Sequence, residues 1–130
     1  MRKISHAHTY TYAHFCPRGR ATRRKRGEYT VFDDESAGTP EYSVSRVVTV
    51  KIDQRAHVAT LVKSVNQPEG LVAASQGNAQ TTPAGDVVAG WGSLPYVSVF
   101  DRSGGLVFNA EFPTGVNTYR AFEYPWLWRS

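Results

Sequence analysis

The sequence predicts an all-β fold built from two copies of a four-stranded antiparallel unit. Three observations support this: apolar residues alternate with period two, turn-forming residues separate the apolar runs, and the order of runs in the second half recurs in the first. No helix is indicated. A single sheet of this kind cannot cover both of its faces, so the pattern is typical of a piece of a larger repeat protein.

The downstream copy, residues 76–112, has all four strands. They are expected at residues 78–82, 86–91, 97–101 and 106–112. Pro83-Ala84-Gly85 supplies the first turn, and Arg102-Ser103-Gly104-Gly105 supplies the last one. In the fourth strand the alternation places four apolar residues on one face: Leu106, Phe108, Ala110 and Phe112.

The upstream copy, residues 28–65, is shorter, and three of its strands are recognisable. They match the last three strands of the downstream copy and lie at residues 27–32, 49–53 and 59–62. Residues 55–63 are predicted to be a turn and a strand because Val58, Thr60 and Val62 are β-branched. After the second copy, residues 117–126 are expected to begin a further strand that has no sheet to join.

The positive charge lies at one end of the chain. The net charge is +4, but residues 1–27 hold eight Lys or Arg and no acid, which leaves seven basic and eleven acidic residues, net −4, in residues 28–130. Residues 1–27 lack apolar periodicity, so we expect a disordered basic segment. An arm that neutralises phosphates, with Tyr10, Tyr12 and Phe15 as stacking surfaces, is the less favoured alternative, and nucleic acid is not an expected partner.

Cofactor, metal and membrane signals are weak. Residues 5–14 are polar, so no apolar core of a signal peptide follows Met1-Arg2-Lys3, and no run approaches the length of a membrane span. Cys16 is the only cysteine, which excludes an internal disulfide and a Cys-rich zinc site. His6 and His8 supply too few fixed ligands for a metal. We expect no metal, no cofactor and no membrane span, and the localisation stays unassigned.

Several short motifs agree in order and spacing with one family. They are Thr30-Val31-Phe32-Asp33-Asp34, Ser45-Arg46, Val50-Lys51-Ile52-Asp53, Gln76-Gly77-Asn78-Ala79-Gln80, Gly90-Trp91-Gly92-Ser93, Phe100-Asp101, Phe112-Pro113, Tyr119-Arg120-Ala121-Phe122 and Pro125-Trp126. Over residues 28–126 the chain resembles the closing section of bacterial arylsulfotransferase-like proteins. The resemblance implies a β-propeller, in which the two copies are two blades and residues 117–126 begin the next. A third interpretation of residues 1–27 is that they are read in a different frame from the relatives, because an arginine-rich, low-complexity stretch begins abruptly before a well-formed β-unit.

The family transfers a sulfuryl group from one phenol to another without a nucleotide sulfate donor. The resemblance implies a histidine that carries the sulfate, assisted by further His, Arg and Asn side chains. Relatives have a Gln-His-Asp stretch before the strand that holds Phe32-Asp33-Asp34, but here residues 17–24 contain no histidine. His57 is expected in a solvated turn. We therefore assign no catalytic residue and expect no sulfotransferase activity from this chain alone. Intact relatives are often exported, but no signal peptide is recognisable here.

A ligand-binding role remains open for the first strand of the downstream copy. First strands line the axis of a propeller, so Gln76, Asn78 and Gln80 are candidates to donate hydrogen bonds to a phenol or aryl sulfate ligand. The alternative is that Gln76 and Asn78 satisfy backbone groups at the start of the strand. Arg120 is the candidate anion contact, and a salt bridge to Glu123 or Asp101 is its alternative. Trp91 is expected to pack between blades.

The leading hypothesis is a truncated, catalytically incomplete arylsulfotransferase-like protein. The second is an interaction module whose exposed sheet faces and edges associate with another chain, including a second copy. Nucleic-acid binding through the basic segment is the weaker alternative.

Overall fold

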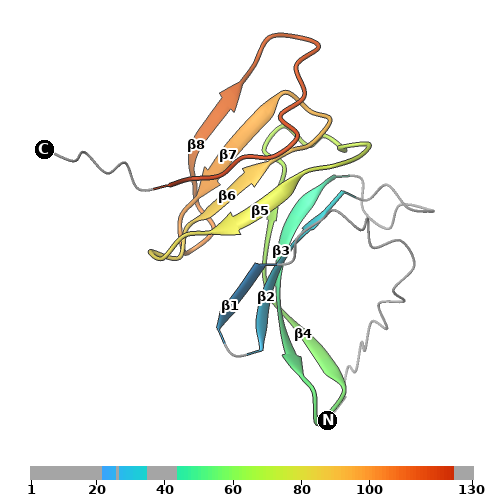
Figure 1. Cartoon of the computed structure of the whole chain (residues 1–130), viewed down its shortest axis with the longest axis vertical. Coiled ribbons are helices and arrows are strands. Elements are labelled where there is room, and N and C mark those ends of the chain that lie inside the picture. Colours follow the sequence, from blue (N-terminus) through green and yellow to red (C-terminus); the bar gives the residue numbers. More distant parts are fainter. Residues whose placement is uncertain (1–21, 26, 35–43, 125–130) are drawn as a thin grey trace, which may run out of the picture.

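The fold is all-β over the part of the chain that the computed structural model describes, residues 22–25, 27–34 and 44–124. These residues contain no helix and form two four-stranded antiparallel sheets (Figure 1). The strands of the first sheet are β1 (Thr22–Lys25), β2 (Glu28–Asp33), β3 (Arg46–Asp53) and β4 (Val58–Asn66). Those of the second sheet are β5 (Asn78–Thr81), β6 (Val87–Gly90), β7 (Tyr96–Phe100) and β8 (Leu106–Glu111). Both sheets follow chain order, so each is a meander of hairpins.

The second sheet agrees with the prediction to within a residue or so at each strand end. In the first sheet, β3 and β4 are longer than predicted. Their register shifts after Thr49, which pairs with Lys63, while Val50 pairs with Leu61. The unpaired Val62 is a β-bulge, and it reverses which face the later residues of β4 occupy. The alternation of side chains between the two faces of β4 is therefore interrupted at the bulge, although β4 continues to pair with β3 as far as Asn66.

The first sheet has a first strand that the sequence did not indicate. Residues 22–25 lie within the segment predicted to be disordered, yet they pair with β2 as strand β1, so that prediction is wrong for these four residues. The polar sequence Thr-Arg-Arg-Lys gives no apolar signal, and it is the backbone ladder that makes the strand. Gly27 supports the turn with a φ of +83°, and its carbonyl accepts a hydrogen bond of 2.7 Å from the Ile52 amide. Residues 1–21 lie outside the described residues.

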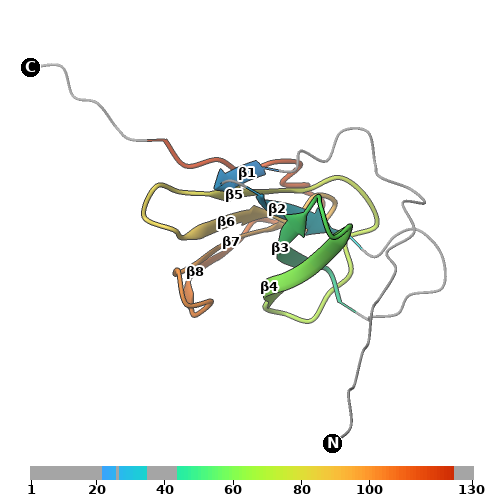
Figure 2. The same ribbon diagram turned by 90° about the horizontal axis from the view of Figure 1, so that it is seen from below.

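The core lies between the two sheets. Trp91 is fully buried, with its ring centroid 5.7 Å from that of Phe32 and 6.5 Å from that of Phe100. As expected, it is a packing residue. The other buried apolar members of this cluster are Val47, Val65, Ala79, Val87 and Ala89. In Figure 2 the strands β1 and β5 lie together near one edge of the molecule, and β5 also contacts β2.

Polar contacts join the sheets at both ends of this core. Between β2 and β5, the hydroxyl oxygens of Thr30 and Thr81 lie 3.0 Å apart. Between β4 and the β7–β8 turn, the ammonium group of Lys63 donates to the carbonyl oxygens of Asp101 and Arg102 at 3.2 and 3.4 Å. Polar contacts therefore join the two sheets at two separate places.

Candidate functional site

The predicted ligand-facing residues lie on the face of the second sheet that is turned away from the first sheet. Along β5, Ala79 joins the core and Thr81 contacts the first sheet, so Asn78 and Gln80 point to the opposite side. We call this side the outer face. From the register of the strands, it carries Asn78, Gln80, Val88, Gly90, Val97, Val99, Phe108 and Ala110.

An extended chain segment, residues 118–124, crosses the β5–β6 end of the outer face, and we call it the tail segment. It follows β8 and the loop after it, and in Figure 1 it runs in red over the second sheet. The tail segment lies in the region expected to begin a further strand, but its described residues join no strand ladder. Residues 125 and 126 of that expected strand lie outside the described residues.

Asn78 and Gln80 hold the tail segment through their side-chain amides. The Asn78 amide group donates to the Ala121 carbonyl at 2.8 Å, and its oxygen accepts from the Ala121 N–H at 2.7 Å. Two residues along, the Gln80 amide group donates to the Glu123 carbonyl at 3.0 Å and accepts from the Glu123 N–H at 2.7 Å. Each amide thus replaces the backbone of a neighbouring strand. In this structure both side chains satisfy backbone groups. For Asn78 this is the alternative that the sequence left open, and for Gln80 the sequence did not indicate it.

Further backbone contacts fix the start of the tail segment. The Tyr119 N–H donates to the Gly92 carbonyl at 3.0 Å, and the Tyr119 carbonyl accepts from the Gly77 N–H at 3.1 Å. Tyr119 has a φ of +49°, which costs a non-glycine residue about 1–3 kcal/mol and persists where the surroundings impose it. Gly90 allows the close approach, because a Cβ atom there would lie 2.6 Å from the Ala121 nitrogen.

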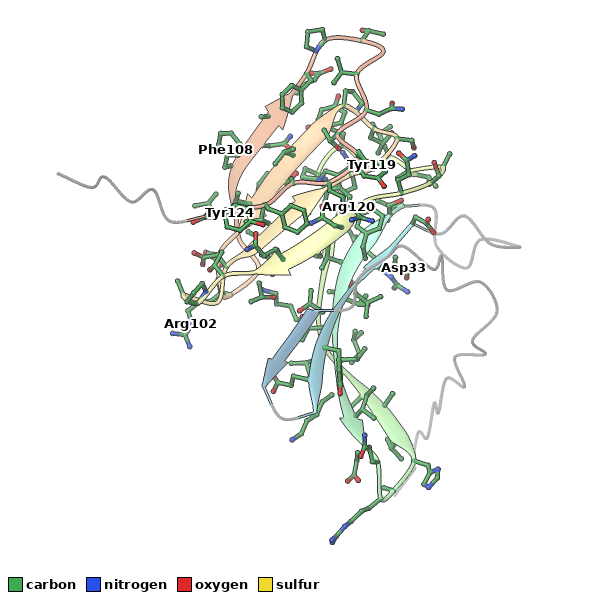
Figure 3. All side chains as sticks on the ribbon, viewed as in Figure 1. Asp33, Arg102, Phe108, Tyr119, Arg120 and Tyr124 are labelled. Carbon is green, nitrogen blue, oxygen red and sulfur yellow. The ribbon has the colours of Figure 1, made fainter. Side chains whose placement is uncertain are left out.

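Arg120 lies between these anchored residues. Its guanidinium carbon is 5.1 Å from the centroid of the Tyr119 ring, a cation–π distance. Arg120 also borders an open hollow of about 250 Å³, whose other lining residues are Val97, Phe112, Val116, Asn117 and Thr118. The hollow combines apolar walls with one cationic and one amide side chain. Figure 3 shows Arg120 near the middle of the molecule, well separated from Arg102.

The structure brings three of the four predicted site residues together. Asn78 and Gln80 share β5, and their amides hold the residues that follow Arg120. Gln76 is exposed, with a φ of +68°, just before the glycine that contacts Tyr119. The sequence did not reveal the tail segment as their partner. The only signal was the shared spacing of two residues between Asn78 and Gln80 and between Ala121 and Glu123.

A chain of hydrogen bonds that begins in the core and runs to the surface on the inner side of the second sheet was also missed. The Trp91 indole N–H donates to the Ser98 hydroxyl at 2.7 Å, and this hydroxyl donates to the side-chain amide oxygen of Asn109 at 2.8 Å. The Asn109 amide group then donates to Glu69 at 3.1 Å. These bonds satisfy the indole inside the core.

Tyr96 lies in the same sheet, on β7. Partial burial raises the pKa of Tyr96, and the hydrogen bond to Glu111 and the charges of Glu111 and Glu69 raise it further.

His57 does not belong to the outer face. It is exposed in the turn between β3 and β4, as the sequence predicted, with a φ of +54°. No group of three or more His, Cys, Asp or Glu side chains that could hold a metal occurs among the described residues. His6, His8, His14, Cys16 and the basic residues up to Arg20 lie outside that part of the chain. Within it, no helix has the length and apolar character needed to cross a bilayer.

Comparison with known proteins gives one family. The family arylsulfotransferase (ASST) matches the chain over residues 3–113. The matched stretch includes both sheets and the basic segment before them, and it ends before the tail segment. No curated protein matches the chain, and no solved structure does.

Proposed function

Because the chain belongs to the arylsulfotransferase (ASST) family, we propose that its two sheets are adjacent blades of a β-propeller that transfers sulfuryl groups between phenols when complete. Two features support this assignment. Both sheets are four-stranded meanders in chain order, and the first strand of the second sheet contacts the first two strands of the first sheet. Neighbouring blades of a propeller are related in this way, with their first strands next to the central axis.

In this proposal the described part of the chain contributes binding groups and not the sulfate-carrying histidine. The one histidine within the described residues is His57. It is exposed at the tip of the β3–β4 hairpin and does not line the proposed ligand site. A nucleophilic imidazole needs a positioned partner and a site that excludes water. The chain alone is therefore expected to be a truncated, inactive form of the family's catalytic unit.

Arg120 carries the proposal for a ligand. Its guanidinium borders a hollow with apolar walls, and an aryl sulfate has an anionic group joined to an apolar ring. Gln76, exposed beside the tail segment, is the amide candidate for a sulfate oxygen. Asn78 and Gln80 would support the same site by holding the backbone on which Arg120 is carried.

Two measurements test this function. Binding of 4-nitrophenyl sulfate should weaken about tenfold or more in Arg120→Gln, because a charge-assisted hydrogen bond is lost. Arg102→Gln is the matched control, since Arg102 is an exposed arginine in the β7–β8 turn. Equal binding by both variants, or no binding by the unchanged chain, would contradict the ligand site. With 4-nitrophenyl sulfate as donor and a phenol as acceptor we expect no turnover, and turnover that disappears in His57→Ala would contradict the inactive assignment.

The exposed outer strands favour a second candidate function, association with another chain. Large apolar side chains that are at least half exposed lie on the fourth strand of each sheet: Val58, Leu61 and Val62 on β4, and Leu106, Val107 and Phe108 on β8. Contiguous apolar surface of this kind is typical of protein interfaces. We expect the apparent mass in sedimentation to rise with concentration. A monomer at all concentrations would remove this candidate. Nucleic-acid binding stays a prediction that rests on the basic segment.

A further inference from the structure

We propose that the amide pair Asn78 and Gln80 is a receptor for an extended chain, and that it accepts the tail segment of a second copy as well as its own. This interaction site adjoins the proposed aryl sulfate site, because Arg120 lies on the tail segment, and it continues onto the exposed part of β8. It requires neither a ligand nor a completed propeller.

The first argument is the form of the contacts. The side-chain amides of Asn78 and Gln80 form four hydrogen bonds with the tail segment, and all four are with backbone atoms of Ala121 and Glu123. Because Asn78 and Gln80 are two residues apart, their amides present donors and acceptors at the same interval as every second residue of an extended chain. The receptor therefore reads an extended backbone, as in the addition of a strand to a sheet edge.

The second argument is steric selection at one position. Gly90 leaves room for the backbone at Ala121, since an added Cβ would lie 2.6 Å from the Ala121 nitrogen and 2.8 Å from the Asn78 amide oxygen. The occupant needs a free N–H at this position, because that group donates to Asn78. The tail segment has both the extended form and the required N–H, so an identical segment from a second copy fits equally well.

The third argument is the connection between the tail segment and its own sheet. Residues 113–117 are exposed, and Gly115 has a φ of +89°, with nothing within 4 Å of the position that a Cβ atom would take there. The turn in this connection has one backbone bond, from Val116 N–H to the Pro113 carbonyl at 3.1 Å. Opening it would let the tail segment reach a neighbouring molecule, the exchange known as domain swapping.

The fourth argument is what surrounds the receptor. Beside the tail segment, the outer face continues onto β7 and β8, where Val97, Val99 and Ala110 are half-buried and Phe108 is 53% exposed. A second copy that delivers its tail segment would lie against this apolar strip. The exchanged contact is thus continuous with surface that remains uncovered in the monomer.

Two full-length variants test the proposal by complementation. Ala121→Pro removes the N–H that Asn78 accepts and adds ring atoms at the close approach to Gly90, so its receptor should be empty. Asn78→Asp combined with Gln80→Glu replaces both amide donors by carboxylates next to carbonyl oxygens, so its receptor should be inactive while its tail segment is free. Neither variant can pair with itself. Mixed together, they should form a 1:1 complex in sedimentation that neither forms alone.

Controls keep the result specific. Gln54 is an exposed turn residue of the first sheet, so Gln54→Glu makes the same kind of amide-to-carboxylate change away from the receptor. Mixed with Ala121→Pro in place of the double variant, Gln54→Glu should not behave as the double variant does. A labelled peptide with the sequence of residues 117–124 should bind the Ala121→Pro chain at least about tenfold more tightly than a peptide carrying the same proline change. Tyr119→Pro, which also removes a tail contact, is a second empty-receptor variant should Ala121→Pro fail to fold.

The outcomes are distinct from those of the ligand test, which concerns Arg120 and a small anion. Complex formation by the mixture, together with selective peptide binding, supports the receptor. Folded variants that form no complex and bind neither peptide overturn it. Equal binding of both peptides would also overturn it, because the receptor would then not read the backbone N–H.

Discussion

The two sheets have the same strand order but very different burial. All four residues of β6, Val-Val-Ala-Gly, are buried, whereas the equivalent strand of the first sheet, β2, has one buried residue, Thr30. The second sheet is covered on one face by the first sheet and, at the β5–β6 end, on the other face by the tail segment. Among the described residues, the first sheet is covered on one face only, by the second sheet.

The difference shows that burial depends on how many layers cover a sheet more than on how hydrophobic its strands are. The layers here are the first sheet, the second sheet and the tail segment. Val31, Val48 and Val50 lie on the far face of the first sheet and are only half-buried, although they are larger than Ala89 and Gly90. Small residues are found where a second layer comes close, as Gly90 lies beneath the tail segment. The second sheet lies between the first sheet and the tail segment. On the face that contacts the tail segment it therefore carries a small residue, Gly90, and two amides, Asn78 and Gln80.

The largest predicted effect is at the layer that both sheets share. Trp91→Ala should reduce the free energy of unfolding by about 3–5 kcal/mol, because it removes a fully buried ring that packs on both sheets. Phe108→Ala, on the exposed outer face, should cost about 1 kcal/mol or less. Urea denaturation followed by far-UV circular dichroism measures both. Similar losses in the two variants would show that the core does not lie between the sheets.

The next effect concerns the cover on the outer face. Gly90→Ala should destabilise by about 1–3 kcal/mol, since the added methyl group meets the backbone of the tail segment. Displacement of the tail should also expose the peptide bond after Arg120. We expect faster tryptic cleavage there in Gly90→Ala than in the unchanged chain, as measured by mass spectrometry. An unchanged cleavage rate would mean that the tail segment does not depend on Gly90.

The sequence predicted the second sheet well because its strands obey local rules. Turns at Gly85 and Gly104 and the alternation in β7 are visible in a window of a few residues. The prediction that Leu106 shares a face of β8 with Phe108 and Ala110 is wrong, because a bulge at Val107 pairs Leu106 with Phe100 and Phe108 with Val99. It did not predict β1, whose Thr-Arg-Arg-Lys sequence has no apolar pattern, or the bulge at Val62, because backbone pairing with a distant strand determines both. Gln76, Asn78 and Gln80 were placed correctly on or just before the first strand, but the partner of the two clasping amides lies more than 40 residues away. No local pattern could have revealed that pairing.

A smaller effect tests how strongly the two sheets are coupled between β2 and β5. Thr30→Val removes a buried hydroxyl that lies 3.0 Å from the Thr81 hydroxyl, and it should cost about 1 kcal/mol. The double variant with Thr81→Val should reduce the free energy of unfolding by less than the sum of the two single changes. Once one hydroxyl is removed, removing the other leaves no hydroxyl of this pair without its partner. Strictly additive losses in a double-mutant cycle would show that this contact does not join the sheets energetically.

The hairpin turns that end the third strand of each sheet offer a closer comparison. In the first sheet, the Asp53 carboxylate accepts the N–H groups of Arg55 and Ala56 at 2.9 and 3.0 Å. In the second sheet, the Asp101 carboxylate accepts the N–H groups of Ser103 and Gly105 at 2.8 and 2.9 Å, and also the Ser103 hydroxyl at 2.6 Å. An aspartate closes both turns, but only the second sheet adds a side-chain donor.

The smallest predicted effect follows from that extra donor. The Ser103 hydroxyl, followed by the Gly105 N–H, lowers the pKa of Asp101 below its ordinary value of 3.8. Because the folded pKa lies below the unfolded one, this group's contribution to stability is present above the ordinary value and is lost as the pH falls through the folded pKa. Ser103→Ala should therefore raise the Asp101 pKa in an NMR titration and reduce the acid dependence of unfolding. If the titration of Asp101 is the same in Ser103→Ala, the hydroxyl does not distinguish the two turns, and backbone donors alone account for both.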